Sequence, residues 1–204
     1  IITDAQALLL FLRHEIARGD TTVAVPVSAT SACERLAAEH NATVKRTPTG
    51  LPALMARAAR PEVVFVGDCD GALMWPELLP APDGLMTFCK ALELMAAEGR
   101  PLSDIVDDLP ETNVVTIDVP TPWDLKGAVM RHVASEASGR GGKLVLLDGV
   151  KVVEADCWAL MIPYPDEPLC RVWAEAPSRA EAEALAGRYA ALVAEVVDGG
   201  PDGS

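Results

Sequence analysis

The sequence predicts an α/β protein with a three-layer α/β domain and mixed sheet, followed by a smaller α+β domain with an open antiparallel sheet. Over the first half of the chain, short β-branched runs alternate with amphipathic helix patterns, which is typical of a sheet with helices on its faces. Near residues 109–112 this order changes, and strand patterns then follow one another and end in a helix. Half of the 204 residues are apolar and 23% are charged, as in packed globular proteins.

We expect the first domain to cover residues 1–109. A helix over 3–18 opens with Thr3 and, three residues later, Gln6, which together form a capping box. A β-branched run predicts a strand over 22–27, and Ser31 with Glu34 predicts the capped start of a second helix that ends near residue 40. The pattern then predicts strands over 42–47 and 63–66 and helices over 52–59, 83–98 and 102–108.

The second domain is expected over residues 110–198, with 199–204 as a flexible tail. A strand over 114–119 precedes Thr121-Pro122, which predicts a helix start, and that helix extends to residue 137 before a flexible turn over 138–142. Asp148-Gly149 predicts a hairpin within 144–153. Two further strands over 157–162 and 169–176 lead to a helix that begins with the capping box of Ser178 and Glu181.

Charge and composition exclude several function classes. The formal net charge is −13, and no basic run with interleaved aromatic residues would overcome its repulsion of nucleic acid. No apolar stretch approaches the ~20 residues that span a bilayer, so we expect no membrane contact. The five cysteines are scattered without metal-ligand spacing, which favours reduced thiols and a cytoplasmic protein.

The segment Gly67-Asp68-Cys69-Asp70-Gly71 follows a predicted buried strand, at the sheet edge where ligands bind in open α/β folds. Asp68 and Asp70 could hold a divalent cation or accept hydrogen bonds from sugar hydroxyls. The alternative is a glycine-flanked turn whose acids cap nearby backbone groups. The carboxylates beside Cys69 predict a raised thiol pKa, which argues against a nucleophile.

Two other loops are candidates for binding. Lys45 and Arg46 stand at a strand end before a turn, where they could meet a phosphate or a sugar oxygen, although a solvated strand end shows the same pattern. The segment 162–168 joins two predicted strands and contains three prolines, which remove N–H donors and fix φ angles. Taken in isolation, this segment is better interpreted as a stiff connection.

These loops, in this order, resemble motifs of the α-D-phosphohexomutase family, which includes phosphomannomutase and phosphoglucomutase. Arg46-Thr47-Pro48-Thr49-Gly50 is similar to the basic-T-x-x-G turn of the family's third domain, and the segment 67–71 stands in the place of its G-E-x-S-G. Trp75-Pro76-Glu77 and Asp83-Gly84 resemble the segment that leads to its long helix, and Asp148-Gly149 its fourth-domain hairpin. The resemblance covers the chain from about residue 2 to residue 197.

The resemblance implies a four-domain enzyme that moves a phosphoryl group between two positions of a hexose. A phosphoserine in the first domain and a magnesium ion held by D-x-D-x-D in the second would carry the chemistry, while the third domain grips sugar hydroxyls and the fourth anchors the second phosphate. The chain contains neither loop, so we expect a cut fragment with no cofactor of its own. Its expected partners are catalytic domains upstream of Ile1 and a sugar or sugar phosphate, and magnesium would belong to those domains.

The sequence departs from the family at the phosphate loop R-P-S-G-T-E-P. Aligned with it, Ile162 replaces the Arg, Tyr164 and Asp166 replace the Ser and Thr hydroxyls, and Pro165 replaces the Gly, while Glu167 remains. Charge-assisted hydrogen bonds contribute roughly 1.5–3 kcal/mol each, so these losses remove several kcal/mol of phosphate affinity. A phosphate would meet two acids, and we expect no compensating cation near this loop.

Three functions remain open from the sequence. The first is a non-catalytic mutase-like module, similar to the C-terminal region of some bacterial mannose-1-phosphate guanylyltransferases, in which a nucleotidyltransferase domain precedes it. The second is the C-terminal half of an active phosphohexomutase with an unusual phosphate anchor. The third is a free-standing binding module with no enzyme attached. The residues before Ile1 would separate these hypotheses, and the oligomeric state stays open.

Overall fold

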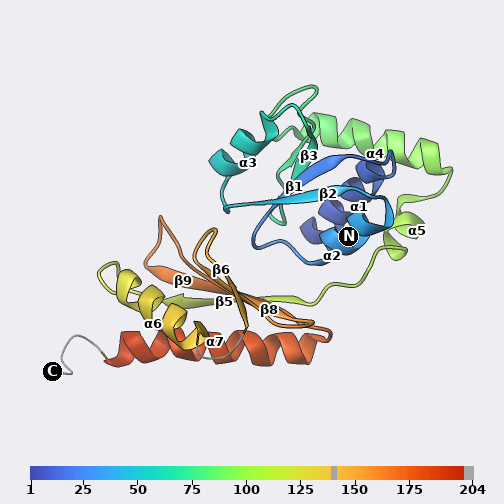
Figure 1. Cartoon of the computed structure of the whole chain (residues 1–204). Helices are drawn as coiled ribbons and strands as arrows, with labels where there is room; N and C mark the ends of the chain where they lie inside the picture. The colour runs from blue at the N-terminus through green and yellow to red at the C-terminus, as the bar shows by residue number, and fades with distance from the viewer. Residues whose placement is uncertain (139–141, 200–204) are drawn as a thin grey trace. The chain divides into compact units, whose positions relative to one another are not determined.

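The computed structural model describes residues 1–138 and 142–199, and the chain divides into two compact units, Ile1–Glu111 and Thr112–Ser204 (Figure 1). The division lies within the segment 109–112, where the sequence pattern changes. The turn predicted over 138–142 and the tail predicted over 199–204 lie largely outside the described residues. No helix among the described residues is long and apolar enough to cross a membrane.

The first unit is built on a four-stranded mixed sheet in the order β2-β1-β3-β4. The central strand β1 runs parallel to both β2 and β3, whereas β4 is antiparallel to β3. The elements are α1 (Asp4–Ile16), β1 (Thr22–Pro26), α2 (Ala32–Glu39), β2 (Thr43–Thr47), α3 (Leu51–Ala58), β3 (Val63–Gly67), β4 (Leu73–Met74), α4 (Gly84–Glu98) and α5 (Leu102–Asp107).

Side chains of β1 point alternately to the two faces of the sheet and contribute to two separate cores, which confirms the three-layer prediction. Val23 and Val25 face one cluster with residues of α1 and α2, whereas Ala24 faces the other with Leu54 and Ala58 of α3. Helices therefore cover both faces of the sheet, α1 and α2 on one side and α3 on the other (Figure 1). A smaller cluster joins α4 and α5 to α1.

Two local predictions in this unit differ from the structure. The capping box of Thr3 and Gln6 is confirmed, but Ser31 makes no capping bond, because its backbone is already helical. Thr30 Oγ1 instead accepts the N–H of Ala32, at 3.1 Å. The strand β4 was not predicted from the sequence, since two residues are too few to show an alternating pattern.

The second unit is a five-stranded sheet in the order β5-β9-β8-β7-β6, in which all neighbouring strands are antiparallel, as predicted. Both helices pack on the same face of this sheet (Figure 1). The elements are β5 (Val114–Pro120), α6 (Lys126–Ser138), β6 (Lys143–Val145), β7 (Val150–Val153), β8 (Trp158–Pro163), β9 (Leu169–Glu175) and α7 (Arg179–Gly199).

The predicted hairpin at Asp148-Gly149 is confirmed between β6 and β7. Gly149 has a φ of +70°, and a Cβ there would lie 2.1 Å from the carbonyl oxygen of Met161, so only glycine fits. The start of α6 was predicted four residues too early. The hydroxyl of Thr121 donates to the carbonyl of Val119 instead of capping a helix, and the helix begins at Lys126 after a turn.

Candidate ligand-binding loops

The parallel strands of the first unit bring three loops to one edge of its sheet. β1 ends at Pro26, β2 at Thr47 and β3 at Gly67, and each is followed by a loop at the carboxyl edge. The predicted residues Arg46, Asp68 and Asp70 therefore lie at the same edge, which is where open α/β sheets bind ligands.

Asp68 holds the Gly67–Gly71 loop together from the inside. Its Oδ1 accepts the backbone N–H groups of Asp70, at 2.9 Å, and Ala72, at 2.8 Å. Its own N–H donates to the carbonyl of Ala72, at 3.0 Å. Burial raises the pKa of Asp68 above its ordinary value of 3.8, although the two backbone hydrogen bonds oppose this rise. Asp68 thus has the capping role given by the simpler interpretation of the sequence.

Asp70 differs from Asp68 because it is exposed at the tip of the same loop. The glycines on either side fix where this tip lies. A Cβ on Gly67 would lie 2.7 Å from Leu8 Cδ1, and Gly71 has a φ of +93°, a conformation that other residues rarely adopt. The Asp70 carboxylate is therefore presented to solvent from a tightly specified turn.

Cys69 lies between these two acids and packs inward toward the neighbouring loop. Burial and the charges of Asp68 and Asp70 raise the pKa of its thiol to about 11. A hydrogen bond with the backbone of Thr30 and the charge of Arg46 oppose this rise. At neutral pH the group is a thiol, as the sequence predicted, which excludes it as an activated nucleophile.

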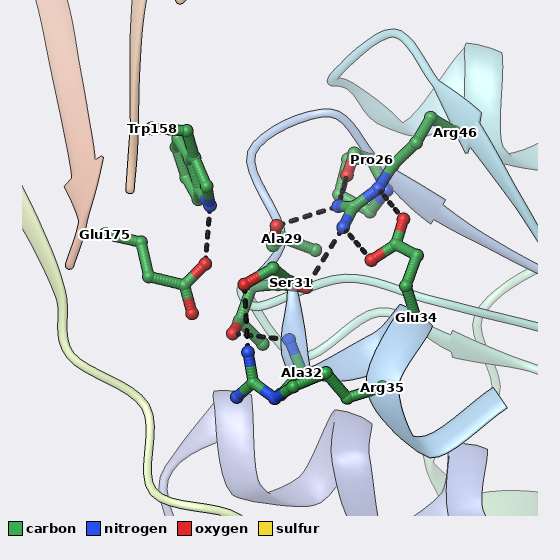
Figure 2. A network of polar contacts seen from close by, with 10 residues as sticks. Pro26, Ala29, Ser31, Ala32, Glu34, Arg35, Arg46, Trp158 and Glu175 are labelled. Carbon is green, nitrogen blue, oxygen red and sulfur yellow. Dashed lines mark hydrogen bonds and ion pairs between the residues drawn. The ribbon is translucent and has the colours of Figure 1, made fainter. Parts of the chain in front are cut away.

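Arg46 builds the loop between β1 and α2, and Figure 2 shows its contacts. Its Nε and Nη2 donate to the two oxygens of Glu34, at 2.8 and 2.6 Å. Nη1 donates to the carbonyls of Pro26 and Ala29, at 2.8 and 2.7 Å, and Nη2 also donates to the carbonyl of Thr30, at 3.0 Å. A guanidinium has five N–H donors, and these contacts use all of them. Arg46 therefore positions the loop that meets Cys69.

No group of three or more His, Cys, Asp or Glu side chains among residues 1–138 and 142–199 could hold a metal ion. Asp68 and Asp70 supply two carboxylates, and Asp68 already accepts two backbone N–H groups. The third aspartate of a D-x-D-x-D motif is missing, because Ala72 follows in that register. These residues do not fit the magnesium site of the phosphohexomutases.

In the second unit, the segment between β8 and β9 forms a short closed loop, the Tyr164–Pro168 loop. The N–H of Tyr164 donates to the carbonyl of Leu169, at 2.9 Å, and the N–H of Leu169 donates back to Glu167, at 2.8 Å. The carbonyl of Pro168 accepts the N–H of Thr121, at 2.7 Å. Pro165 and Pro168 have no N–H to offer, so few backbone donors remain for an anion.

The expectation that no cation lies near this loop was wrong. The ammonium group of Lys126 donates to the carbonyls of Tyr164 and Glu167, at 2.5 and 2.6 Å, and lies 3.5 Å from the centre of the Trp123 ring. Sequence reasoning missed Lys126 because it placed this residue one turn inside a helix, whereas α6 begins there. The Pro122 signal was correct for a turn but not for the helix start.

A second cation, Arg171, stands on β9 beside the same loop. Its guanidinium carbon is 4.5 Å from the centre of the Tyr164 ring, and its Nε and Nη2 donate to Asp118 on β5, at 2.6 and 2.8 Å. These hydrogen bonds hold the pKa of Asp118 below its ordinary value. Arg171 and Asp118 face each other in the register of β5 and β9.

The structure also places the residue that replaces the family's arginine. Ile162 lies within β8 opposite Arg171, and it is 5% exposed. It is a buried strand residue, whereas Asp166 and Glu167 are exposed in the loop. The predicted phosphate-loop residues are therefore brought together along one strand end, but their polar groups do not converge on an open anion site.

The first unit matches the sequence profile described as phosphoglucomutase/phosphomannomutase, alpha/beta/alpha domain III, over residues 4–113. A protein of Methanopyrus kandleri named a probable phosphoglucosamine mutase is 32% identical over 181 residues, which are 89% of this chain and 40% of that protein. A phosphoglucosamine mutase of Methanococcus maripaludis is 28% identical over 192 residues, which are 90% of this chain and 42% of that protein.

Solved structures show the same fold over both units. A phosphoglucomutase/phosphomannomutase family protein from Burkholderia thailandensis superposes with a TM-score of 0.83 at 20% identity, over 98% of this chain and 43% of that one. A phosphoglucomutase from Paramecium superposes with a TM-score of 0.74 at 13% identity, over 97% of this chain and 42% of that one. The chain thus spans about two fifths of the length of these relatives.

Proposed function

Because the chain belongs to the phosphoglucomutase/phosphomannomutase family, we propose that it forms the sugar-recognising C-terminal part of a hexose-phosphate mutase and catalyses no reaction alone. In this proposal residues 1–109 correspond to the family's third domain, which binds sugar hydroxyls, and 110–198 to its fourth. The relatives named above are mutases, which favours this setting over a nucleotidyltransferase. The transfer chemistry and its magnesium belong to other domains of such an enzyme.

The observation that carries the proposal is the geometry of the Gly67–Gly71 loop. Asp68 is used to close the loop, and Asp70 remains exposed at its tip, at the carboxyl edge of the sheet. A carboxylate accepts hydrogen bonds from hydroxyl groups, so Asp70 is suited to a vicinal diol of a hexose. Arg46 supports this surface indirectly, by fixing the loop that packs against Cys69.

In the second unit, the same proposal holds that the Tyr164–Pro168 loop does not anchor a phosphate. Its backbone N–H groups at Tyr164 and Leu169 are used within the loop. Its carbonyls converge on Lys126, and two carboxylates, Asp166 and Glu167, face the solvent. A dianion placed there would meet these carboxylates, because Lys126 and Arg171 already contact the loop carbonyls and Asp118.

Lys126 favours a second candidate, the C-terminal part of an active mutase with an altered phosphate anchor. Its ammonium group is at the loop although the family's arginine is replaced by Ile162. A lysine supplies a point charge for phosphate, without the bidentate geometry of an arginine. In this candidate the incoming phosphate would draw Lys126 away from the two carbonyls.

Calorimetric titration with glucose 6-phosphate and glucose 1-phosphate separates the two candidates. The first predicts dissociation constants in the millimolar range or weaker, with no change in the Lys126→Met variant. A submillimolar constant that Lys126→Met abolishes would support the active anchor and contradict the first candidate. Lys143→Met is the matched control, since Lys143 is exposed on the edge strand β6 of the same unit.

A gain-of-function variant tests the alignment of the Tyr164–Pro168 loop. We would combine Tyr164→Ser, Pro165→Gly and Asp166→Thr, which restore two hydroxyls and one N–H donor to the loop. Ile162 stays unchanged, because an arginine there would bury a charge within β8. The triple variant is expected to gain at least tenfold in glucose 6-phosphate affinity. No gain, in a variant with unchanged circular dichroism, would count against the alignment.

A further inference from the structure

A cavity of about 580 Å³ lies within the first unit, at the sheet edge opposite the Gly67–Gly71 loop. Its walls come from the carboxyl ends of α1 and α3, the start of β3 and the segment after β4. All four segments belong to one unit, and the volume is within the range of small-molecule sites. This α1–α3 cavity is lined by two acids, two arginines and an apolar wall, which include Glu15, Glu77, Arg18, Arg60, Pro61 and Val63.

Glu15 brings a buried acceptor to the α1–α3 cavity, since it is only 2% exposed. Its Oε1 accepts the indole N–H of Trp75, at 2.8 Å. The Trp75 ring is held in turn by the rings of Phe11 and Phe65, each 5.3 Å away between centres. The other oxygen, Oε2, lies 3.6 Å from Nη1 of Arg18, which is beyond hydrogen-bond length. A carboxylate accepts at both oxygens, so Oε2 remains an acceptor for a ligand.

Two helix ends add to the negative potential around Glu15. Helix α1 ends at Ile16 and α3 ends at Ala58, and both carboxyl ends contribute to the lining of the cavity. The carboxyl end of a helix carries a partial negative charge, which favours a cation nearby. A ligand with an ammonium group therefore matches this part of the cavity.

Arg60 supplies the opposite charge from the segment that follows α3. Its side chain is exposed, and it forms no ion pair or hydrogen bond within residues 1–138 and 142–199. A guanidinium can hold a carboxylate through two parallel N–H donors. Pro61, Val63 and Pro76 provide apolar surface in the same lining. The cavity thus offers an acceptor for an ammonium, donors for a carboxylate and a wall for an apolar group.

We propose that the α1–α3 cavity binds a free α-amino acid with a large apolar side chain. Its ammonium donates to Oε2 of Glu15, its carboxylate accepts from Arg60, and its side chain packs against the apolar wall. Such a ligand has no net charge, so the formal charge of −13 does not repel it as it repels a nucleotide or a sugar phosphate. This site goes beyond the proposed sugar-binding function and does not depend on it, because it lies at the other edge of the sheet.

Trp75 provides a reporter for this site in the otherwise unchanged chain. L-phenylalanine is expected to shift the indole N–H signal of Trp75 in ¹H–¹⁵N NMR, with a dissociation constant below about 1 mM. Trp75→Phe assigns the signal among the four tryptophans. N-acetyl-L-phenylalanine has no ammonium and L-phenylalaninamide has no carboxylate. Each analogue is expected to bind about tenfold more weakly, because it loses one charge-assisted contact.

Two variants identify the residues that hold the ligand. Arg60→Met should weaken L-phenylalanine binding about tenfold, and so should Glu15→Gln, which keeps an acceptor for Trp75 but removes the charge. Arg57→Met is the matched control, since Arg57 lies in the last turn of α3 outside the cavity lining, and it should bind as the wild type does. If Glu15→Gln does not fold, the exposed change Arg60→Met and the two analogues decide the question.

Three results would overturn the proposal. The first is no shift of the Trp75 indole signal with either L-phenylalanine or L-leucine at about 10 mM. The second is equal binding of L-phenylalanine and both analogues, which would show that the charged groups are not read. The third is unchanged binding in Arg60→Met, or an equal loss in Arg57→Met, since either would remove the role given to Arg60.

Discussion

The Gly67–Gly71 loop and the Tyr164–Pro168 loop both follow a buried strand and both carry two acids, but opposite charges hold them together. In the first loop, the carboxylate of Asp68 gathers backbone N–H groups. In the second, the ammonium of Lys126 gathers backbone carbonyls. The residue that closes a loop thus decides which polar groups remain for a ligand.

Because different groups close the two loops, the two units keep different parts of the family's binding features. The first loop keeps its glycine geometry and an outward carboxylate, Asp70, so it retains a means of binding hydroxyls. The second loop uses its carbonyls on an internal cation and has prolines where donors are needed.

Arg46→Met tests how far the first loop region depends on one partly buried cation. The variant leaves the carbonyls of Pro26, Ala29 and Thr30 without their donors, and Ala29 and Thr30 are fully buried. We expect a loss of about 3 kcal/mol, to which the half-exposed partner Glu34 contributes little. Hydrogen exchange of the β1 and β3 amides measures this loss within the first unit. Lys45→Met, an exposed change on the same strand, should have an effect below about 0.5 kcal/mol.

Lys126→Met removes the internal cation of the second loop. The two carbonyls at Tyr164 and Glu167 are partly accessible to water, so we expect a smaller loss, about 2 kcal/mol. Hydrogen exchange in β8 and β9 should report it, while amides of β1 and β3 remain unchanged. If Lys126→Met matched the exposed control Lys143→Met, the ammonium would not be what closes this loop.

Asp68→Ala and Asp68→Asn separate the acceptor role of Asp68 from its charge. The alanine variant loses both hydrogen bonds and should cost about 1 kcal/mol, whereas asparagine keeps an acceptor. Burial raises the pKa of Asp68 in the folded protein. The stabilising contribution of Asp68 is therefore fully present below its unfolded pKa of 3.8, and it is lost as the pH rises through its folded pKa. At pH 7 Asp68→Asn should therefore equal or exceed the wild type in urea denaturation. A clear destabilisation by asparagine would show that the charge is needed.

Asp118→Asn should give the smallest loss of stability, and its pH dependence should be opposite to that of the Asp68 variants. Hydrogen bonds from Arg171 lower its pKa, so its contribution is present above the unfolded value of 3.8 and is lost as pH falls through the folded value. Asp118 is 43% exposed, and we expect Asp118→Asn to cost less than about 1 kcal/mol at pH 7. In urea denaturation the difference from wild type should shrink as the pH falls below 3.8, and the exposed change Asp156→Asn is the matched control.

The sequence predicts the features that depend on near neighbours. Thr3 with Gln6 and Ser178 with Glu181 form capping boxes, and Gly149 marks a hairpin, because each signal requires residues that lie within a few positions of one another. The layer order also follows from alternation, since Val23 and Ala24 must face different sides.

What the sequence does not predict is which distant groups the site residues meet. Arg46 reaches the carbonyls of Pro26 and Ala29 across a crossover, and Lys126 reaches Tyr164 over 38 positions of sequence. The spacing at Arg46 resembles a ligand-binding turn, although its donors are all used within the protein. Side-chain to backbone contacts of this kind depend on tertiary packing, which leaves no periodic signal in the sequence.

The most direct test of the contrast between the loops is a ¹H–¹⁵N NMR titration of the chain with glucose 6-phosphate. The account predicts millimolar binding that shifts the backbone amides of Asp70 and Gly71 and leaves those of Asp166 and Glu167 in place. Shifts at Asp166 and Glu167 with a submillimolar dissociation constant would contradict it, because they would show a phosphate seated on the loop that Lys126 closes.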